Sequence, residues 1–122
     1  MDMQIETRLS DQIARYLDLA TSEAKLTAAN MANIDTPGYR ALGMDFGTEM
    51  QRALKDIEGG STAQPVRVKE VDGLIARPDG NDVSMDRESL NLAEAQLKFK
   101  AGATLLHGEY QRIMDAIHAD SK

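Results

Sequence analysis

The sequence predicts a mainly α-helical protein whose long N- and C-terminal helices pair as a coiled-coil hairpin, with a small irregular middle segment holding a short helix and a β-hairpin. Apolar and small residues near both ends of the chain recur at alternating steps of four and three, the spacing of a heptad seam. Glycine, proline and short apolar runs lie between the two patterns and indicate turns. We expect a single domain over residues 1–122, with helices at about 9–34 and 86–118 joined by residues 35–85.

The first predicted helix has apolar residues on more than one flank. Its heptad seam runs from Ile13 to Ile34, and a second stripe containing Leu9, Leu19 and Leu26 lies beside it. A single partner helix would cover only one of these stripes, so the helix is expected to pack against more than one neighbour. The large apolar seam residues are Ile13, Leu17, Met31 and Ile34.

The run from Ala29 to Arg40 predicts where this helix ends. Thr36 precedes a proline and is therefore biased away from helical backbone angles. Pro37 and Gly38 suit the two central positions of a type II turn, where glycine supplies the positive φ. The helix should end near Asn33 or Ile34.

Two asparagines in the same run, Asn30 and Asn33, carry amide groups that can both donate and accept hydrogen bonds. Carbonyls of the last helical turn lack partners inside a helix, and these amides could bond them. They could equally bond groups of a neighbouring chain. The residues alone leave both alternatives open.

The middle segment predicts a short helix followed by two strands. Residues 44–57 show helical spacing, and Gly59-Gly60 interrupts it. Residues 66–71 begin with strand-like alternation, Asp72-Gly73 is a strong hairpin turn signal, and residues 74–76 can return as the second strand.

The second long helix is expected to start at Asp86, whose carboxylate could cap free amides at the helix N-terminus. Gly102 and Gly108 lie inside it at about 1 kcal/mol each relative to alanine, which indicates either close backbone approach or tolerated weakness. Its seam is predicted at Leu92, Phe99, Leu106, Tyr110, Ile113 and Ile117. A flanking stripe contains Leu90, Leu97, Ala101, Leu105 and Met114.

Composition disfavours several classes of function. The 14 basic and 20 acidic residues give a formal charge of -6, which removes the electrostatic basis for nucleic-acid binding. The chain has no cysteine, so disulfides, thiolate metal sites and cysteine nucleophiles are excluded. Charged residues interrupt the first 30 positions, and we expect neither a Sec-type signal nor a membrane span.

Catalytic, cofactor and metal sites are not expected. His107 and His118 would lie about 16 Å apart along one helix, too far to share a metal ion. The run Asp79–Asp82 faintly resembles a calcium loop, but its glycine is misplaced and Leu90 occupies the position of the bidentate glutamate. No Gly-x-Ser-x-Gly element, phosphate loop or His-Glu-x-x-His run occurs. We expect a protein that is not an enzyme and needs no cofactor.

The run Ala29–Arg40 resembles the N-terminal signature of the bacterial flagellar rod, hook and hook-associated proteins, which reads Ala-Asn-x-Ala-Asn-x-x-Thr-Pro-Gly-Tyr followed by a basic residue. The stretch Asp79–Glu88 and its continuation resemble the C-terminal half of a short proximal-rod protein of this family. Two positions differ, because Ala95 and Phe99 stand where such proteins often have Asn and Tyr. A second proximal-rod type, FlgC, is an alternative, but its Pro-Asn-Val segment and Arg-x-Tyr-Glu-Ala-Asn motif are absent.

The resemblance implies a structural subunit of the proximal rod that assembles helically through its terminal helices, as part of the motor drive shaft. It implies type III export without a cleaved Sec signal, and a place in the periplasm-spanning rod of the basal body. The implied partners are copies of the chain, rod subunits of the FlgC, FlgF and FlgG types, the adaptor FliE and the export apparatus. The implied contact residues are Asn30, Asn33, Thr36, Pro37, Gly38 and Tyr39. A soluble helical-hairpin binding module is the alternative from a different class.

Overall fold

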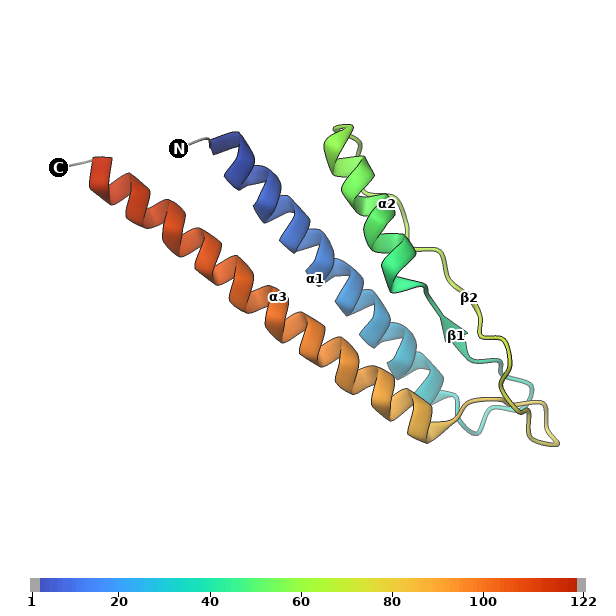
Figure 1. Ribbon diagram of the computed structural model, residues 1–122. Helices are drawn as coiled ribbons and strands as arrows, with labels where there is room; N and C mark the ends of the chain where they lie inside the picture. Colours follow the sequence, from blue (N-terminus) through green and yellow to red (C-terminus); the bar gives the residue numbers. More distant parts are fainter. Residues whose placement is uncertain (1–2, 121–122) are drawn as a thin grey trace.

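The computed structural model describes residues 3–120, with side chains described from Thr7 onward. Within these residues, two long helices and a shorter one accompany a two-stranded antiparallel sheet. The elements are α1 (Met3–Ala32), β1 (Leu42–Gly43), α2 (Phe46–Glu58), β2 (Lys69–Glu70) and α3 (Met85–Asp120). Figure 1 shows α1 and α3 running antiparallel, with α2 on the other side of α1, so that the start of α1 and the end of α3 lie at the same end of the molecule. The predicted mainly α fold with paired terminal helices is confirmed.

Small residues let α1 and α3 approach closely. Ala20 on α1 and Ala95 on α3 are buried. A Cβ atom placed on Gly102 would lie 2.7 Å from Cδ2 of Leu17, well inside van der Waals contact. Of the two explanations for a glycine within this helix, close backbone approach therefore applies to Gly102. A Cβ on Gly108 would meet nothing within 4 Å.

Helix α2 confirms the short helix expected in the middle segment. Asp45 caps its N-terminus, because its carboxylate accepts a hydrogen bond of 3.0 Å from the backbone N–H of Thr48. This hydrogen bond is the main reason that the pKa of Asp45 is lowered. Gly59 caps the other end, and Gly60 follows it with a φ of 71°.

Aromatic contacts attach the start of α2 to the two long helices. The rings of Tyr16 on α1 and Phe46 on α2 meet edge to face with centroids 5.3 Å apart. The ammonium of Lys98 on α3 lies 4.0 Å from the centroid of the Phe46 ring. Lys98 also pairs with Glu23 of α1 at 3.2 Å, so one lysine connects all three helices.

The small sheet exists, but the expected β-hairpin is wrong in its pairing. Strand β1 pairs with β2, with Leu42 opposite Glu70 and Gly43 opposite Lys69, and residues 74–76 form no strand. Next to the two strands, the Val71 N–H donates to the carbonyl of the buried Ala41 at 2.9 Å, so the segment that follows the Pro37-Gly38 turn pairs with β2. That pairing places β2 against an anchored segment.

The start of α3 also differs from the expectation. The helix begins at Met85, and the hydroxyl of Ser84 accepts a hydrogen bond of 3.3 Å from the Arg87 N–H, which is the geometry of an N-cap. Asp86 lies inside the first turn, where its charge favours the helix dipole without capping the helix.

Candidate assembly motif and interface surfaces

The turn after α1 has the predicted form. The Tyr39 N–H donates to the Thr36 carbonyl at 3.2 Å, and Gly38 has a φ of 75°, as the third position of a type II turn requires. The Asn33 amide donates to the Ala29 carbonyl at 2.8 Å, and the Thr36 hydroxyl lies 3.0 Å from the Asn33 side-chain oxygen. Asn33 therefore satisfies a carbonyl of the last helical turn of its own chain.

Asn30 fastens β1 to α1. Its amide nitrogen donates to the Leu42 carbonyl at 2.8 Å, and its oxygen accepts from the Leu42 N–H at 3.0 Å. The same oxygen accepts from the Tyr39 hydroxyl at 3.1 Å, and the Asn30 side chain is almost completely buried. These contacts satisfy the Asn30 side chain within the chain itself.

A third asparagine, Asn81, holds the turn from the side of the segment that precedes α3. Its amide donates to the carbonyls of Asn33 at 2.9 Å and Thr36 at 2.8 Å, and its oxygen accepts from the Val83 N–H at 2.8 Å. Asn81 is 0% exposed. The segment before α3 thus binds the end of α1 through one buried side chain.

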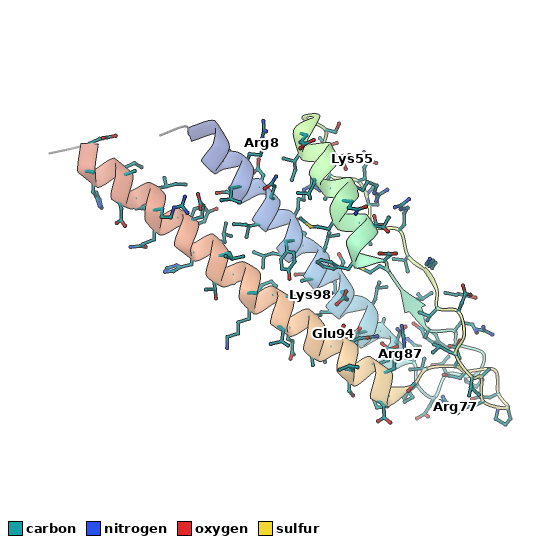
Figure 2. All side chains as sticks on the ribbon, in the orientation of Figure 1. Arg8, Lys55, Arg77, Arg87, Glu94 and Lys98 are labelled. Carbon is teal, nitrogen blue, oxygen red and sulfur yellow. The ribbon has the colours of Figure 1, made fainter. Side chains whose placement is uncertain are left out.

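Asp82 and Arg77 complete this junction, by which we mean residues 29–42 together with 77–83. One Asp82 oxygen accepts from the Ala41 N–H at 2.6 Å, and the other pairs with Arg40 at 3.1 Å. Arg77 donates to the carbonyls of Val83 and Ile34, and Figure 2 shows it at the end of the molecule opposite the chain ends. The junction therefore fixes the position of the end of α1 relative to the start of α3.

Tyr39 of the junction interacts electrostatically with Glu88 of α3. Burial raises its pKa, and the negative charge of Glu88 raises it further. Glu88 is completely buried, and Arg87 donates to its carboxylate at 2.7 Å. The neutral phenol is the form that fits this environment.

Sequence reasoning read Asp79–Asp82 as a turn and did not identify Asn81 or Asp82 as site residues. The sequence contained part of the information, because residues 79–88 resemble the C-terminal half of a short proximal-rod protein. Turn-forming Asn and Asp are usually exposed, however, and only the folded chain shows that both are buried. Burial with satisfied hydrogen bonds is what distinguishes a structural clamp from an ordinary turn.

The face of α3 that packs on α1 is unusual. Every seventh residue on its buried line is small or acidic: Glu88, Ala95, Gly102 and Glu109. Large apolar side chains point elsewhere, with Leu90, Leu97 and Leu105 exposed by 61%, 68% and 62%. Helix α3 thus buries small and acidic residues along this line and leaves these three leucines uncovered.

The predicted seam residues lie partly on this buried side. In α1, the half-buried seam residues are Ile13, Leu17, Met31 and Ile34. In α3, Leu92, Leu106 and Ile113 are half-buried, while Phe99, Tyr110 and Ile117 are exposed by 48%, 55% and 51%. The predicted seam of α3 is therefore only partly covered within one chain.

Neither a metal site nor a membrane span is found in the part of the chain that the structure describes. The side chains described between residues 7 and 120 include no group of three or more His, Cys, Asp or Glu placed to bind a metal ion. No helix in this range combines the length and the apolar character needed to cross a membrane.

Comparison with known proteins decides the family. No family model matches the chain. The flagellar basal body rod protein FlgB of Salmonella typhimurium is 34% identical over 119 aligned residues, covering 83% of this chain and 86% of the relative. The chain belongs to the FlgB family. FlgB of Cereibacter sphaeroides is 31% identical over 127 aligned residues, covering 93% and 99%, and FlgB of Escherichia coli is 25% identical over 121.

Within this FlgB-family chain, the residues expected to contact neighbouring subunits fall into two groups. Asn30 is buried, and Asn33 and Tyr39 are half-buried in the junction. The exposed group consists of Thr36, Pro37 and Gly38. The motif therefore combines an internal clamp with a short exposed turn. Membership in the FlgB family also argues against the FlgC alternative.

Proposed function

We propose that this chain is a structural, non-catalytic subunit of the flagellar rod that assembles through the outward faces of its terminal helices. Its relatives carry the name of basal body rod proteins. The observation that carries the proposal is the arrangement of α3, which leaves a row of leucines, Leu90, Leu97 and Leu105, exposed. A monomer rarely leaves such a row uncovered unless another surface covers it.

The exposed leucines supply enough apolar surface to matter. Leu90, Leu97 and Leu105 are each more than 60% exposed. Complete burial of a leucine contributes roughly 1.5–3 kcal/mol, so covering this row contributes roughly 1–2 kcal/mol per residue. The hairpin seam, with Gly102 and two buried glutamates, lacks comparable apolar mass. Contacts between subunits would therefore complete the burial that the hairpin leaves unfinished.

The geometry of the exposed surfaces favours an open assembly. The outward face of α1 includes the small residues Ala14, Ala28 and Ala29, whereas that of α3 carries large leucines. Contact between two different surfaces on successive copies is heterologous, and it generates a helical filament when the rotation does not close. A rod built from such subunits needs no additional binding domain.

The junction would serve this assembly by holding the exposed turn. Thr36, Pro37 and Gly38 would contact a neighbouring subunit, while Asn30 and Asn33 keep the turn in place from inside. The seam residues of α3 that remain exposed, such as Phe99 and Tyr110, would be covered by neighbouring helices.

The partners we propose are copies of this chain, rod subunits of the FlgC, FlgF and FlgG types, the adaptor FliE and the flagellar type III export apparatus. We propose that the chain is exported through that apparatus without a cleaved Sec signal and assembles in the periplasm-spanning rod. The acidic balance of the chain, with a net charge of -6, gives no support for a nucleic-acid partner.

The proposal is tested by deleting the gene in its flagellated host and examining basal bodies by electron microscopy. We expect non-motile cells without a complete rod, and restoration of both when the gene is supplied from a plasmid. Motile cells with complete basal bodies after deletion would overturn the proposal.

A further inference from the structure

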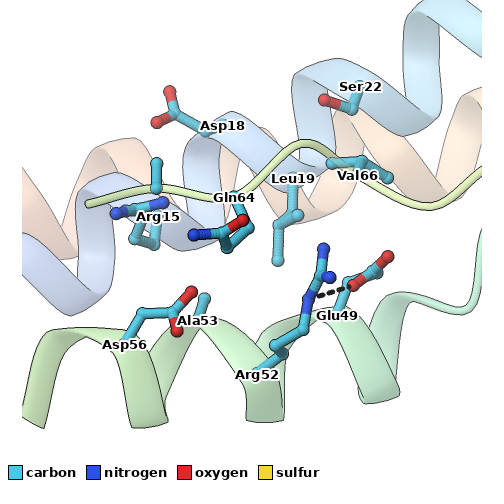
Figure 3. A pocket seen from close by; sticks show the side chains of 11 residues that line it. Arg15, Asp18, Leu19, Ser22, Glu49, Arg52, Ala53, Asp56, Gln64 and Val66 are labelled. Atoms are coloured by element: carbon cyan, nitrogen blue, oxygen red, sulfur yellow. Dashed lines mark ion pairs between the residues drawn. The ribbon is translucent and has the colours of Figure 1, made fainter. Parts of the chain in front are cut away.

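Residues 61–68, here called the strap, cross the face of α2 without forming a helix or a strand. Strap residues line a cavity of about 110 Å³ together with α1 and α2 (Figure 3). Val66 is the strap residue that is not exposed, and it shares this cavity with the buried Leu19 and Ala53. The strap therefore shields apolar surface between two helices while remaining largely exposed itself.

One buried carboxylate fastens the strap. Glu49 on α2 is 3% exposed, and one of its oxygens accepts the backbone N–H of Arg67 at 2.6 Å. The same oxygen lies 3.4 Å from Nε of Arg67, and the other oxygen pairs with Nε of Arg52 at 3.1 Å, as the dashed line in Figure 3 shows. The far end of the Arg52 side chain donates to the Pro65 carbonyl at 2.6 Å. The described polar contacts of residues 65–68 thus pass through Glu49 or its ion-pair partner.

We infer that Glu49 is a latch: its carboxylate holds the strap on α2, and loss of that charge releases residues 62–68 while the pair of long helices stays folded. The pair of long helices has its own packing, because Ala20 and Ala95 are buried and Gly102 of α3 lies against Leu17 and Tyr16 of α1. The latch is independent of the proposed rod function, because it depends only on contacts inside one chain.

Positive charges dominate the contacts to the carboxylate itself. The charged groups around Glu49 are Arg52 and Asp56 on α2, the N-cap residue Asp45, Arg15 and Asp18 on α1, Arg67 of the strap and Lys69 of β2. Arg52 and Arg67 are the charges within ion-pair distance. The cationic partners come from α2 and the strap, so the charge of Glu49 joins these two segments.

The latch is closed at neutral pH. Burial acts to raise the pKa of Glu49, but hydrogen bonds from Arg67 and the charges of Arg52 and Arg67 outweigh it, so the pKa lies below its ordinary value. A lowered pKa means that the ionised carboxylate stabilises the folded strap above the pKa of an unfolded glutamate. This contribution is lost as the pH falls through the folded-state pKa, and acid therefore opens the latch.

The test is amide hydrogen exchange followed by NMR at pH 7 on the whole chain and on Glu49→Gln and Glu49→Ala variants. We expect the Arg67 amide to exchange at least about tenfold faster in both variants, because alanine removes the acceptor oxygen and glutamine removes the charge that pairs with Arg52 and Arg67. Amides around Ala20 and Gly102 should keep their wild-type rates. Glu58→Gln is the matched control, since Glu58 is an exposed glutamate on the same helix and should leave the Arg67 amide unchanged.

Two results would overturn the latch. One is wild-type protection of the Arg67 amide in both Glu49 variants; the other is faster exchange by one common factor in the strap and in α1 and α3. A pH titration of the unmodified chain gives a second, mutation-free measurement. The proton shift of the Arg67 amide should follow a single ionisation below the ordinary range of glutamate, and a shift that does not move with pH would also refute the latch.

Discussion

Replacing Asn81 by aspartate keeps the shape of the side chain but removes both donors that hold the turn. In the native chain the Asn81 amide donates to the Asn33 and Thr36 carbonyls at 2.9 and 2.8 Å, from a fully buried position. A carboxylate there would face two carbonyl oxygens. The hydrogen bond from the Val83 N–H would persist, because it uses the oxygen that both side chains share.

The magnitude follows from these contacts. Two lost hydrogen bonds contribute about 1 kcal/mol each to the loss of stability. Burying the second carboxylate oxygen, which faces the two carbonyls without a donor, adds roughly 1–3 kcal/mol. We therefore expect Asn81→Asp to lower the free energy of unfolding by about 3–5 kcal/mol at pH 8, a large share of the 5–15 kcal/mol that is usual for a domain.

Urea unfolding followed by far-UV circular dichroism measures this loss, with Asn81→Ala as the matched control. The alanine variant loses the same donors and also the oxygen that accepts from the Val83 N–H, but adds no charge, so we expect a loss of about 3 kcal/mol at both pH 8 and pH 5. The aspartate variant should recover about 1 kcal/mol or more at pH 5 relative to wild type, because protonation removes the buried charge and restores a donor.

A loss below about 1 kcal/mol for Asn81→Asp would refute the clamp at the junction, because it would mean that the two carbonyls do not depend on this amide. Equal pH dependence of the aspartate and alanine variants would refute the buried placement of residue 81. Amide hydrogen exchange at Tyr39, whose N–H closes the turn, shows whether the loss of stability arises at this turn.

Two further pairs of variants and one single variant test other parts of the fold by the same unfolding measurement. Gly108→Ala should stabilise the chain by about 0.5–1 kcal/mol, whereas Gly102→Ala should destabilise it, because its new methyl group meets α1; equal effects would contradict the close approach. Ser84→Ala should lose about 1 kcal/mol and Asp86→Ala only a few tenths, and the reverse order would reassign the N-cap. Tyr39→Phe should lose about 1 kcal/mol. Because the pKa of Tyr39 is raised, the stabilisation by its neutral phenol is present below the ordinary tyrosine pKa and is lost as the pH rises through the folded-state pKa. If Tyr39→Phe lost as much stability at alkaline pH as the unmodified chain, this account of Tyr39 would be contradicted.

The local patterns of the chain predicted its elements well. Thr36-Pro37-Gly38 fixes a turn through backbone sterics alone, and the structure shows that turn. Strand pairing was harder to predict, because it depends on which segment is already anchored. Asp72-Gly73 favours a local hairpin, but Asn30 holds β1 against α1, and β2 pairs there instead. Ile75 is consequently left 93% exposed.

The junction could be predicted only in part. Asn33 bonds a carbonyl four residues away, which is a local contact that spacing can suggest. Asn81 bonds carbonyls more than forty positions away, and that contact exists only once α1 and α3 have brought their ends together. Burial of Asp82 likewise depends on the Ala41 N–H reaching it from a distant segment.

The periodicity of α3 did not determine which of its stripes faces α1. Apolar residues occur on several flanks, so more than one heptad line fits the sequence equally well. Ala95 and Gly102 form the close contact because small residues permit it, and leucines such as Leu97 are displaced outward. The role of the outward residues in assembly stays a prediction.

That role is tested most directly by incorporation of Leu97→Asp into basal bodies. Leu97 is the most exposed leucine of the outward row, whereas the nearby Lys100 is exposed but not apolar. In a gene-deleted host we expect Lys100→Asp to enter purified basal bodies, and Leu97→Asp to be absent from them and to leave cells non-motile, because its charge would be buried between subunits. Equal incorporation of both variants, with normal motility, would contradict assembly through the outward face of α3.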